Sequence, residues 1–314
     1  MHDSLKDFLK CPHCSGSLSI SGAEYANRII MSGRLACARC KQSFEIVRGI
    51  PRFLLGETYA GSFGFQWKRF YDVQIDAISR NKESENTFIE KTGFTSADVK
   101  GKVILDAGVG AGRFADLVAR WRCKKAVGVD LSEAVETAFN NVGDRDNVDI
   151  VQADIFSLPF EKESFDIIYS IGVLHHTPDT KKAFMHLVPF LKKGGVFAIY
   201  VYSAYARKRI WIGSEILRKA TPKLPVKLIY YLSALAIPVY YLYKFPLFDL
   251  WLYPLFPISR HPNWKHRWLE TFDWYTPIYQ WKHTYAEVYN WFKEAGFTEI
   301  EPLDYPVCMR GVKG

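Results

Sequence analysis

The sequence predicts an α/β fold in which a sheet binds a small molecule at one edge, preceded by a small cysteine-rich module. Three observations predict it. The stretch VILDAGVGAGRF, residues 103–114, has the pattern of a strand, a glycine turn and a helix. Further short apolar runs alternate with helical segments as far as residue 202, which is typical of strands joined by helices. Two cysteine pairs lie ahead of this region, within the first 40 residues.

Length and composition limit the number of domains and the classes of partner. The chain has 314 residues, 48% of them hydrophobic, which is enough for one large domain or one and a half. The net charge of +8 fits an acidic partner such as RNA or an anionic membrane, or a basic surface without a partner. The opening MHDSLKDFLK has no basic segment followed by an apolar one, so it predicts no secretory signal. We therefore expect a cytoplasmic protein.

Four of the six cysteines form two C-x-x-C pairs, CPHC and CARC, separated by 22 residues: Cys11, Cys14, Cys37 and Cys40. Two such pairs at this separation are typical of a zinc ribbon, in which four thiolates fill all positions of one structural ion. Two disulfides are the alternative, but they need an oxidising compartment. We expect this module to span residues 1–57. Cys123 and Cys308 stand apart and are interpreted as core residues.

Residues 58–100 contain aromatic side chains at mixed helical spacing and are predicted to form a helical lid or linker. The glycine turn that follows differs from two common phosphate-binding loops. Gly108 and Gly110 fit the dinucleotide pattern G-x-G-x-x-G, but its third position is Arg113, and the glycine comes one residue early, at Gly112. No Gly-Lys-Ser/Thr follows either, so the loop is not expected to hold a pyrophosphate.

The order D-x-G-x-G-x-G instead resembles motif I of the class I S-adenosylmethionine-dependent methyltransferases, and four later segments over residues 101–202 agree with it. The closest likeness is to the group that includes quinone and other small-molecule methyltransferases. The resemblance implies a Rossmann-like seven-stranded sheet. It also implies that Asp130 binds both ribose hydroxyls, while Asp154 and the backbone N–H of Ile155 bind adenine. The whole cofactor set implied is Asp106, Gly108, Gly110, Gly112, Asp130, Leu131, Asp154, Ile155 and Ser170. The N-terminal module likewise resembles zinc ribbons that accompany methyltransferases.

Candidate catalytic residues follow the fourth predicted strand, in LHHTPD. This places His175 and His176 at the carboxyl end of the sheet, where ligands bind in open α/β folds. A histidine there could take a proton from the acceptor. The alternative is that one of them only hydrogen-bonds to backbone and shapes the loop.

Residues 203–277 are interpreted as an inserted helical, apolar cap. The insert begins with seven Lys or Arg against Glu215, then has sixteen uncharged residues between Lys227 and Lys244, interrupted by Pro238. That run is too short to span a bilayer. Three interpretations remain open: a cap over an apolar substrate, peripheral contact with one membrane leaflet through residues 203–258, or a dimer or packing element.

Residues 278–314 are predicted to complete the core. Thr284 and Glu287 have capping-box spacing at the start of a helix, and the last segments predict an antiparallel hairpin. The stretches DWYTP and HTYAEV resemble segments that border the acceptor pocket in related methyltransferases. Tyr275 and His283 are therefore second-rank candidates for substrate contact.

Together these features predict a methyltransferase that uses S-adenosylmethionine and a structural zinc ion. We expect it to modify oxygen or carbon of a hydrophobic small molecule or lipid-like intermediate. The alternative is a zinc-ribbon-containing rRNA or tRNA base methyltransferase, because a ribbon ahead of this fold also resembles ribosomal-RNA methyltransferases and +8 suits phosphate contacts. Against this alternative, the basic residues of the insert lead into a long apolar tract, which RNA binding does not require.

Overall fold

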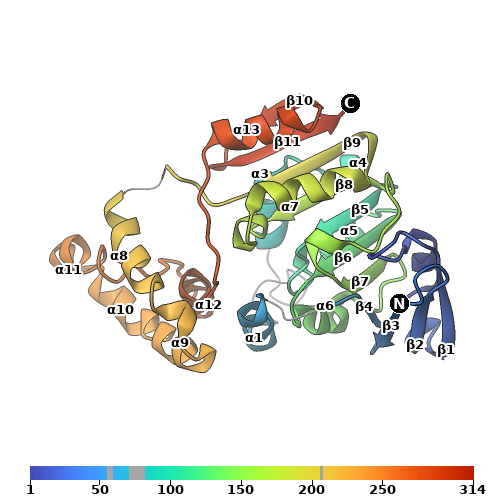
Figure 1. Ribbon diagram of the computed structural model, residues 1–314. Helices are drawn as coiled ribbons and strands as arrows, with labels where there is room; N and C mark the ends of the chain where they lie inside the picture. Colours follow the sequence, from blue (N-terminus) through green and yellow to red (C-terminus); the bar gives the residue numbers. More distant parts are fainter. Residues whose placement is uncertain (55–58, 71–81, 206–207) are drawn as a thin grey trace.

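The protein is described here by a computed structural model that covers residues 1–54, 59–70, 82–205 and 208–314 (Figure 1). Within these residues eleven strands form one continuous sheet, in the order β1-β2-β3-β4-β7-β6-β5-β8-β9-β11-β10. The strands are β1 (Leu18–Ala26), β2 (Ile29–Cys37), β3 (Ser43–Val47), β4 (Ile50–Arg52), β5 (Val103–Ala107), β6 (Lys125–Asp130), β7 (Val148–Gln152), β8 (Phe165–Ile171), β9 (Leu191–Tyr200), β10 (Phe297–Pro302) and β11 (Cys308–Lys313).

Seven of the strands form the predicted Rossmann-like sheet. Strands β7, β6, β5, β8 and β9 are parallel, and every residue of β5 and β7 is buried, as expected for strands covered on both faces. Strand β11 pairs antiparallel with β9, and β10 pairs antiparallel with β11, so the predicted closing hairpin is confirmed. The β10–β11 register shifts between Thr298 and Glu301.

Helices cover both faces of this sheet (Figure 1). One face packs against α3 (Glu83–Thr92), α5 (Arg113–Arg120) and α6 (Ala134–Val142), and a short α4 (Ser96–Val99) precedes β5. The other face packs against α7 (Thr180–Leu187) and α13 (Tyr285–Glu294). The predicted capping box at Thr284 and Glu287 is present at the start of α13.

The cysteine-rich module is joined directly to this sheet. Strands β1 to β4 form an antiparallel ribbon, and β4 then pairs in parallel with β7, where the Phe53 N–H donates to the Gln152 carbonyl at 2.7 Å. Beneath this junction the buried Lys125 forms an ion pair with Asp149, which also accepts the His2 backbone N–H at 2.7 Å. The ribbon is thus an extension of the sheet, because the outer edge of β7 offers unpaired backbone groups. At the free side of the ribbon, the β1–β2 register shifts around Glu24.

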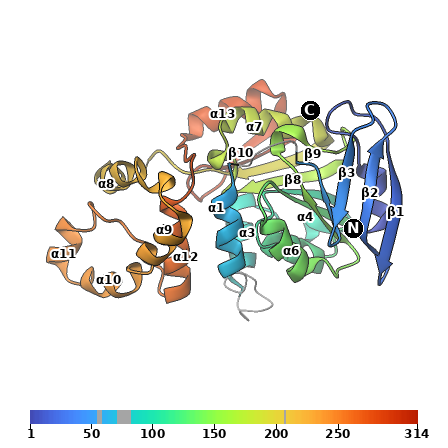
Figure 2. The ribbon, with the colours of Figure 1, turned by 60° about the horizontal axis from the view of Figure 1, so that its bottom comes forward.

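A helical lobe projects from the carboxyl end of β9, at the left of Figure 1 (Figures 1 and 2). It comprises α8 (Lys208–Arg218), α9 (Val226–Ser233), α10 (Ala236–Leu242), α11 (Pro246–Trp251) and α12 (Trp264–Tyr275). Helix α1 (Gly61–Arg69) lies between this lobe and the sheet (Figure 2). Of the segment predicted as a lid or linker, residues 58 and 71–81 lie outside the described residues. Among the described helices, none combines the length and apolarity needed to cross a membrane.

Candidate cofactor and acceptor site

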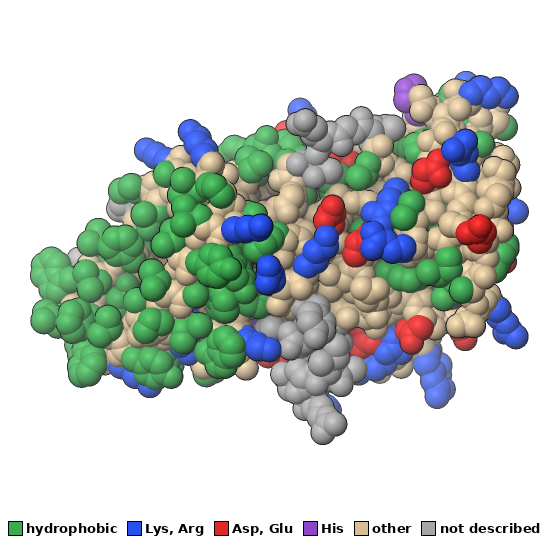
Figure 3. All heavy atoms as spheres, turned by 90° about the horizontal axis from the view of Figure 1, so that it is seen from below, with side chains coloured by type: hydrophobic (Ala, Val, Ile, Leu, Met, Phe, Trp, Pro, Cys, Tyr) green, Lys and Arg blue, Asp and Glu red, His purple; other side chains and the backbone are tan. Residues whose placement is uncertain are grey.

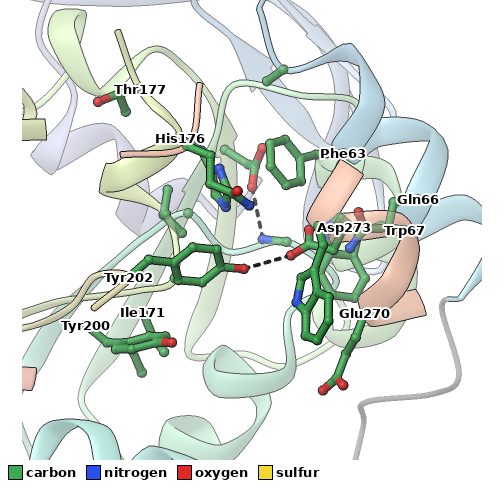
Figure 4. Close-up of a pocket in the computed structure, with 18 of the residues that line it drawn as sticks. Phe63, Gln66, Trp67, Ile171, His176, Thr177, Tyr200, Tyr202, Glu270 and Asp273 are labelled. Atoms are coloured by element: carbon green, nitrogen blue, oxygen red, sulfur yellow. Dashed lines mark hydrogen bonds between the residues drawn. The ribbon is translucent and has the colours of Figure 1, made fainter. Parts of the chain in front are cut away.

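A cavity lies at the carboxyl ends of β5, β6, β8 and β9, between α1 on one side and α12 of the lobe on the other (Figure 4). Its volume of about 830 Å³ is in the range of cavities that bind small molecules and cofactors. Because the sheet supplies one wall and the lobe another, residues more than 150 positions apart in the sequence meet in this space.

The glycine turn forms one end of the cavity with bare backbone. Gly108 has φ +103°, and a Cβ atom there would lie 2.2 Å from a methyl carbon of Val173. A Cβ on Gly110 would lie 3.2 Å from the ring of Trp67, which comes from α1. Both residues line the cavity, so a bound molecule can approach the main chain closely. Gly112, at φ +90°, is the N-cap residue of α5 and does not line the cavity.

Asp130 lies at the end of β6 and faces the same space. One of its carboxylate oxygens accepts the Gly110 N–H at 3.0 Å, and the other accepts the Ser132 N–H at 2.9 Å and hydroxyl at 2.7 Å. Burial raises the pKa of this carboxyl above its usual value, and these hydrogen bonds act in the opposite direction. Because two carboxylate oxygens offer about four acceptor sites, Asp130 retains capacity for a hydroxyl in the cavity. Leu131 and Ile155 line the cavity beside it.

Three other residues of the predicted cofactor set support the loops from outside the cavity lining. Asp106 is buried and accepts the Tyr169 hydroxyl at 3.0 Å, and burial raises its pKa to about 7. Ser170 is fully buried and donates to the Ala107 carbonyl at 2.7 Å. Asp154 caps a short 3-10 turn by accepting the Phe156 N–H at 3.0 Å. Asp106 and Ser170 therefore lie behind the glycine turn, and their contact with a cofactor stays a prediction.

The two adjacent histidines have different surroundings. His176 lines the cavity, and its Nδ1 lies 2.8 Å from the Tyr279 carbonyl, so Nδ1–H donates and Nε2 keeps its lone pair. Burial lowers the pKa of His176 to about 4, which keeps the ring neutral. His175 is fully buried, stacks on Tyr202 with 3.9 Å between ring centroids, and is not part of the cavity wall. Of the two predicted bases, only His176 reaches the site.

The second-rank candidates are also outside the cavity wall. The Tyr275 hydroxyl donates to the Pro257 carbonyl at 2.7 Å, inside the lobe. His283 Nε2 lies 2.9 Å from the Thr180 hydroxyl, and its ring packs edge-on against Trp291 of α13. Both side chains are used in packing, and their contact with a substrate stays a prediction.

Beyond the glycine turn the cavity has aromatic walls and two carboxyl groups that the sequence did not reveal, Asp273 and Glu270 of α12. Asp273 of α12 accepts the Tyr202 hydroxyl at 3.1 Å and a hydrogen bond from Gln66 of α1 (Figure 4). Burial raises the pKa of Asp273 to about 6. Its position among aromatic side chains, with a raised pKa, is the arrangement expected of a proton acceptor. Tyr200 and Trp274 complete this wall.

Two cations also line the cavity. Lys91 of α3 places its ammonium 4.0 Å from the centre of the Tyr200 ring, and burial lowers its pKa to about 8. Arg113, at the start of α5, lies next to the glycine turn. They bring positive charge to an otherwise largely aromatic space.

The four paired cysteines meet in the ribbon. Cys11 Sγ lies 3.6 Å from Cys40 Sγ, Cys14 Sγ lies 3.5 Å from Cys37 Sγ, and all four sulfurs lie within 4.8 Å of one another. Sulfurs of a tetrahedral zinc site with bonds of about 2.3 Å are about 3.8 Å apart. No disulfide joins these cysteines, and a Cβ on Gly16 would lie 3.0 Å from the Cys37 sulfur. The cluster fits structural zinc, as predicted.

A second group of possible ligands joins α3 to α12. His261 Nε2 and His266 Nδ1 lie 3.6 Å and 3.4 Å from a carboxylate oxygen of Glu83. His261 Nδ1, however, accepts the Asn263 backbone N–H at 3.1 Å, which places the ring proton on Nε2, toward Glu83. A protonated nitrogen does not ligate a metal, so this group is an electrostatic contact between the core and the lobe.

Comparison with known families decides the class of the domain. Residues 105–199 match the family described as "Methyltransferase domain", and residues 2–49 match the family described as "Trm112p-like protein". The first match contains the glycine turn, Asp130 and both histidines. The chain carries a class I methyltransferase domain. S-adenosylmethionine is the methyl donor of this family, and the bare glycine turn and the hydrogen-bonding capacity of Asp130 fit it.

Curated relatives of the methyltransferase domain carry the names of different methyltransferases. The sterol 24-C-methyltransferase of Eremothecium gossypii is 29% identical over 146 residues, which is 45% of this chain and 38% of that protein. Phosphoethanolamine N-methyltransferase 2 of Caenorhabditis elegans is 35% identical over 151 residues, 46% of this chain and 32% of that protein. The chain thus spans less than two fifths of these relatives.

Solved structures similar to this chain include a methyltransferase from Mesorhizobium loti, with 30% identity over 32% of this chain and 47% of that one, at a TM-score of 0.31. Another is a chain from the complex between the Haloferax volcanii Trm112 methyltransferase activator and a methyltransferase. It has 15% identity over 80% of this chain and 96% of that one, at a TM-score of 0.46.

Proposed function

We propose that this protein transfers a methyl group from S-adenosylmethionine to oxygen or carbon of a hydrophobic small molecule or lipid-like intermediate. One observation carries the proposal. A single cavity joins the glycine turn and Asp130 to an aromatic chamber whose walls hold the buried carboxyl group of Asp273. The aromatic walls around this carboxyl group suit an apolar acceptor, because they gain from excluding water.

The residues around the glycine turn are assigned to the cofactor. Asp130 accepts from the ribose hydroxyls, and Ile155 lies beside the adenine. Lys91 and Arg113 offer positive charge to the methionine carboxylate. Bound S-adenosylmethionine supplies a methyl group already activated on a sulfonium. The remaining work of the protein is to place the acceptor in line with that methyl group and to exclude water.

Asp273 is assigned the role of proton acceptor for the methylated atom. Its pKa of about 6 keeps it ionised at neutral pH, while its burial makes it more basic than an ordinary aspartate. Tyr202 and Gln66 hold the carboxylate in place by hydrogen bonds. His176 is a weak base, since its pKa is about 4, and therefore positions the acceptor through the Nε2 lone pair.

An RNA base is the second candidate acceptor. The zinc-ribbon module in front of the domain and the net charge of +8 favour it. A base would have to leave its stack and enter the aromatic chamber. The surface of the lobe beside the chamber is dominated by exposed apolar side chains, which RNA does not require.

The test is to incubate the purified protein with methyl-labelled S-adenosylmethionine and a cell extract. The product is then partitioned between organic solvent, RNA, protein and small polar solutes. Label in the organic phase supports the proposal, and its loss with the Asp273→Asn variant ties the reaction to this chamber. Label recovered in RNA moves the function to base modification and overturns the assignment of an apolar acceptor.

A further inference from the structure

The helical lobe has an unusual surface. In the described part of the chain twenty-four large apolar side chains are exposed, and fifteen of them lie between Leu224 and Phe256, in and around α9, α10 and α11. We call these the apolar face: Leu224, Leu228, Tyr231, Leu232, Leu235, Tyr241, Leu242, Phe245, Leu247, Phe248, Leu250, Trp251, Leu252, Leu255 and Phe256. Figure 3 shows apolar side chains covering most of this end of the molecule.

These side chains are well exposed. Tyr231 is 67% exposed, Leu247 66% and Trp251 63%. Helix α9, which carries Tyr231, also buries Ile229 and Ser233, whereas α11, which carries Leu247 and Trp251, buries none of its residues. Exposed apolar surface on this scale is rare in proteins that have no partner for it. The lobe has a small hydrophobic core of its own around Ala236, Tyr243 and Tyr253, and the side chains of the apolar face are not part of it.

The unpaired charges around the apolar face are lysines. Lys219, Lys223, Lys227 and Lys244 are exposed, and no ion pair with a carboxylate joins any of them among the residues the structure describes. Figure 3 shows Lys and Arg side chains at the edge of the apolar area. The nearby Asp249 is paired with Arg260, and Glu215 with Lys282, so neither offsets these lysines.

We propose that the helical lobe docks on the surface of an anionic membrane. The apolar face enters the boundary between headgroups and acyl chains, and the four lysines contact the anionic headgroups. Its short helices match this geometry, since an interfacial element lies in the plane of the leaflet and does not span it. The aromatic side chains of the face, such as Trp251 and Tyr241, favour the same depth. The unpaired positive charge selects an anionic bilayer over a second copy of this chain, which would bring the lysines against each other.

The chain passes directly from the apolar face to the cavity wall. Pro257, which follows the exposed Phe256, lines the cavity, and so does Tyr205, which is 61% exposed. A molecule leaving the leaflet beside Phe256 would meet the aromatic chamber without crossing the sheet. Docking itself is independent of the proposed function; only the delivery of a membrane-borne acceptor to the chamber rests on it.

The test measures binding of the full chain to vesicles of phosphatidylcholine alone and of phosphatidylcholine mixed with phosphatidylglycerol. We expect binding to the anionic vesicles and a blue shift of tryptophan fluorescence. Replacing both Leu247→Glu and Trp251→Glu removes two inserted side chains and should weaken binding by at least about a hundredfold. Replacing Lys223→Gln and Lys227→Gln should weaken it about twenty-fivefold, since each lysine contributes about fivefold.

Tyr289→Glu, on exposed α13 away from the lobe, is the matched control and should bind like the parent. Absence of vesicle binding, or equal binding by the Leu247/Trp251 variant and the control, overturns the proposal. So does a dimer in light scattering that the Leu247/Trp251 variant dissociates while vesicle binding is absent. Because the assay contains neither cofactor nor acceptor, its failure leaves the proposed methyl transfer standing. Failure of methyl transfer in detergent likewise leaves docking untouched.

Discussion

Replacing Gly108 by alanine tests whether the turn between β5 and α5 must stay free of side chains. The new Cβ would lie 2.2 Å from a methyl carbon of Val173, on a backbone at φ +103°. A side chain at positive φ costs about 1–2 kcal/mol. Overpacking of this kind costs about 1–3 kcal/mol more. We therefore expect the free energy of unfolding to fall by about 2–5 kcal/mol, and cofactor affinity to fall with it as the turn shifts.

The assay combines urea unfolding, with and without S-adenosylmethionine, and calorimetric titration of the cofactor. Saturating cofactor at a hundred times Kd should stabilise the parent by about 2.7 kcal/mol and the variant by much less. The double variant Gly108→Ala with Val173→Ala removes the two methyl carbons but leaves the Cβ of residue 173 at 2.8 Å, as well as the backbone strain. It should therefore recover only part of the loss in unfolding free energy.

One result would refute this reasoning. If Gly108→Ala unfolds at the same urea concentration as the parent and binds S-adenosylmethionine equally well, the turn tolerates a side chain. The close approach of a ligand to its backbone would then not be required. Full recovery in the double variant would show that the positive φ contributes nothing.

Three further predictions address separate parts of the molecule. Asp273→Asn should lower kcat by about 10²–10⁴-fold while sparing cofactor affinity. In the parent protein, kcat/KM should fall as the pH drops through about 6, because Asp273 is then protonated and can no longer accept the proton of the acceptor. Cofactor affinity should decline as the pH rises through about 8, where Lys91 loses its charge, and titrations of Lys91→Gln should lack that step. Cys11→Ser should release zinc in a metal assay and lower the thermal stability of the ribbon, because zinc binding contributes directly to its folding. Flat pH profiles, or a serine variant that retains its metal, would contradict the respective prediction.

Local patterns made part of the site predictable. Strand, glycine turn and helix follow one another within residues 103–120, so their geometry is set by short-range backbone preferences that the sequence displays. The same holds for the cysteine pairs and for the capping box at Thr284. Each is a short arrangement whose chemistry requires those residue types at that spacing.

The rest of the site depends on how distant segments pack. Asp273 belongs to a helix of the lobe and becomes buried only where α12 meets Tyr202 and α1, which no local pattern indicates. His175 and His176 are neighbours in one 3-10 turn, and the turn's orientation alone sends one into the cavity and the other beneath Tyr202. Likewise, the pairing of β4 with β7 depends on a single Arg52–Gln152 step and carries no sequence signal.

The joining of the ribbon to β7 also affects how the protein behaves in a crowded solution. An open parallel sheet exposes a row of unpaired amides that can recruit a strand from another molecule and start aggregation. Here the ribbon moves that edge outward to β1, whose pairing is interrupted around Glu24, while the opposite edge, β10, is interrupted between Thr298 and Glu301. Irregular edges of this kind are poor templates for a further strand. The zinc module therefore replaces a regular parallel edge with an irregular antiparallel one, which disfavours the pairing of a strand from a second molecule.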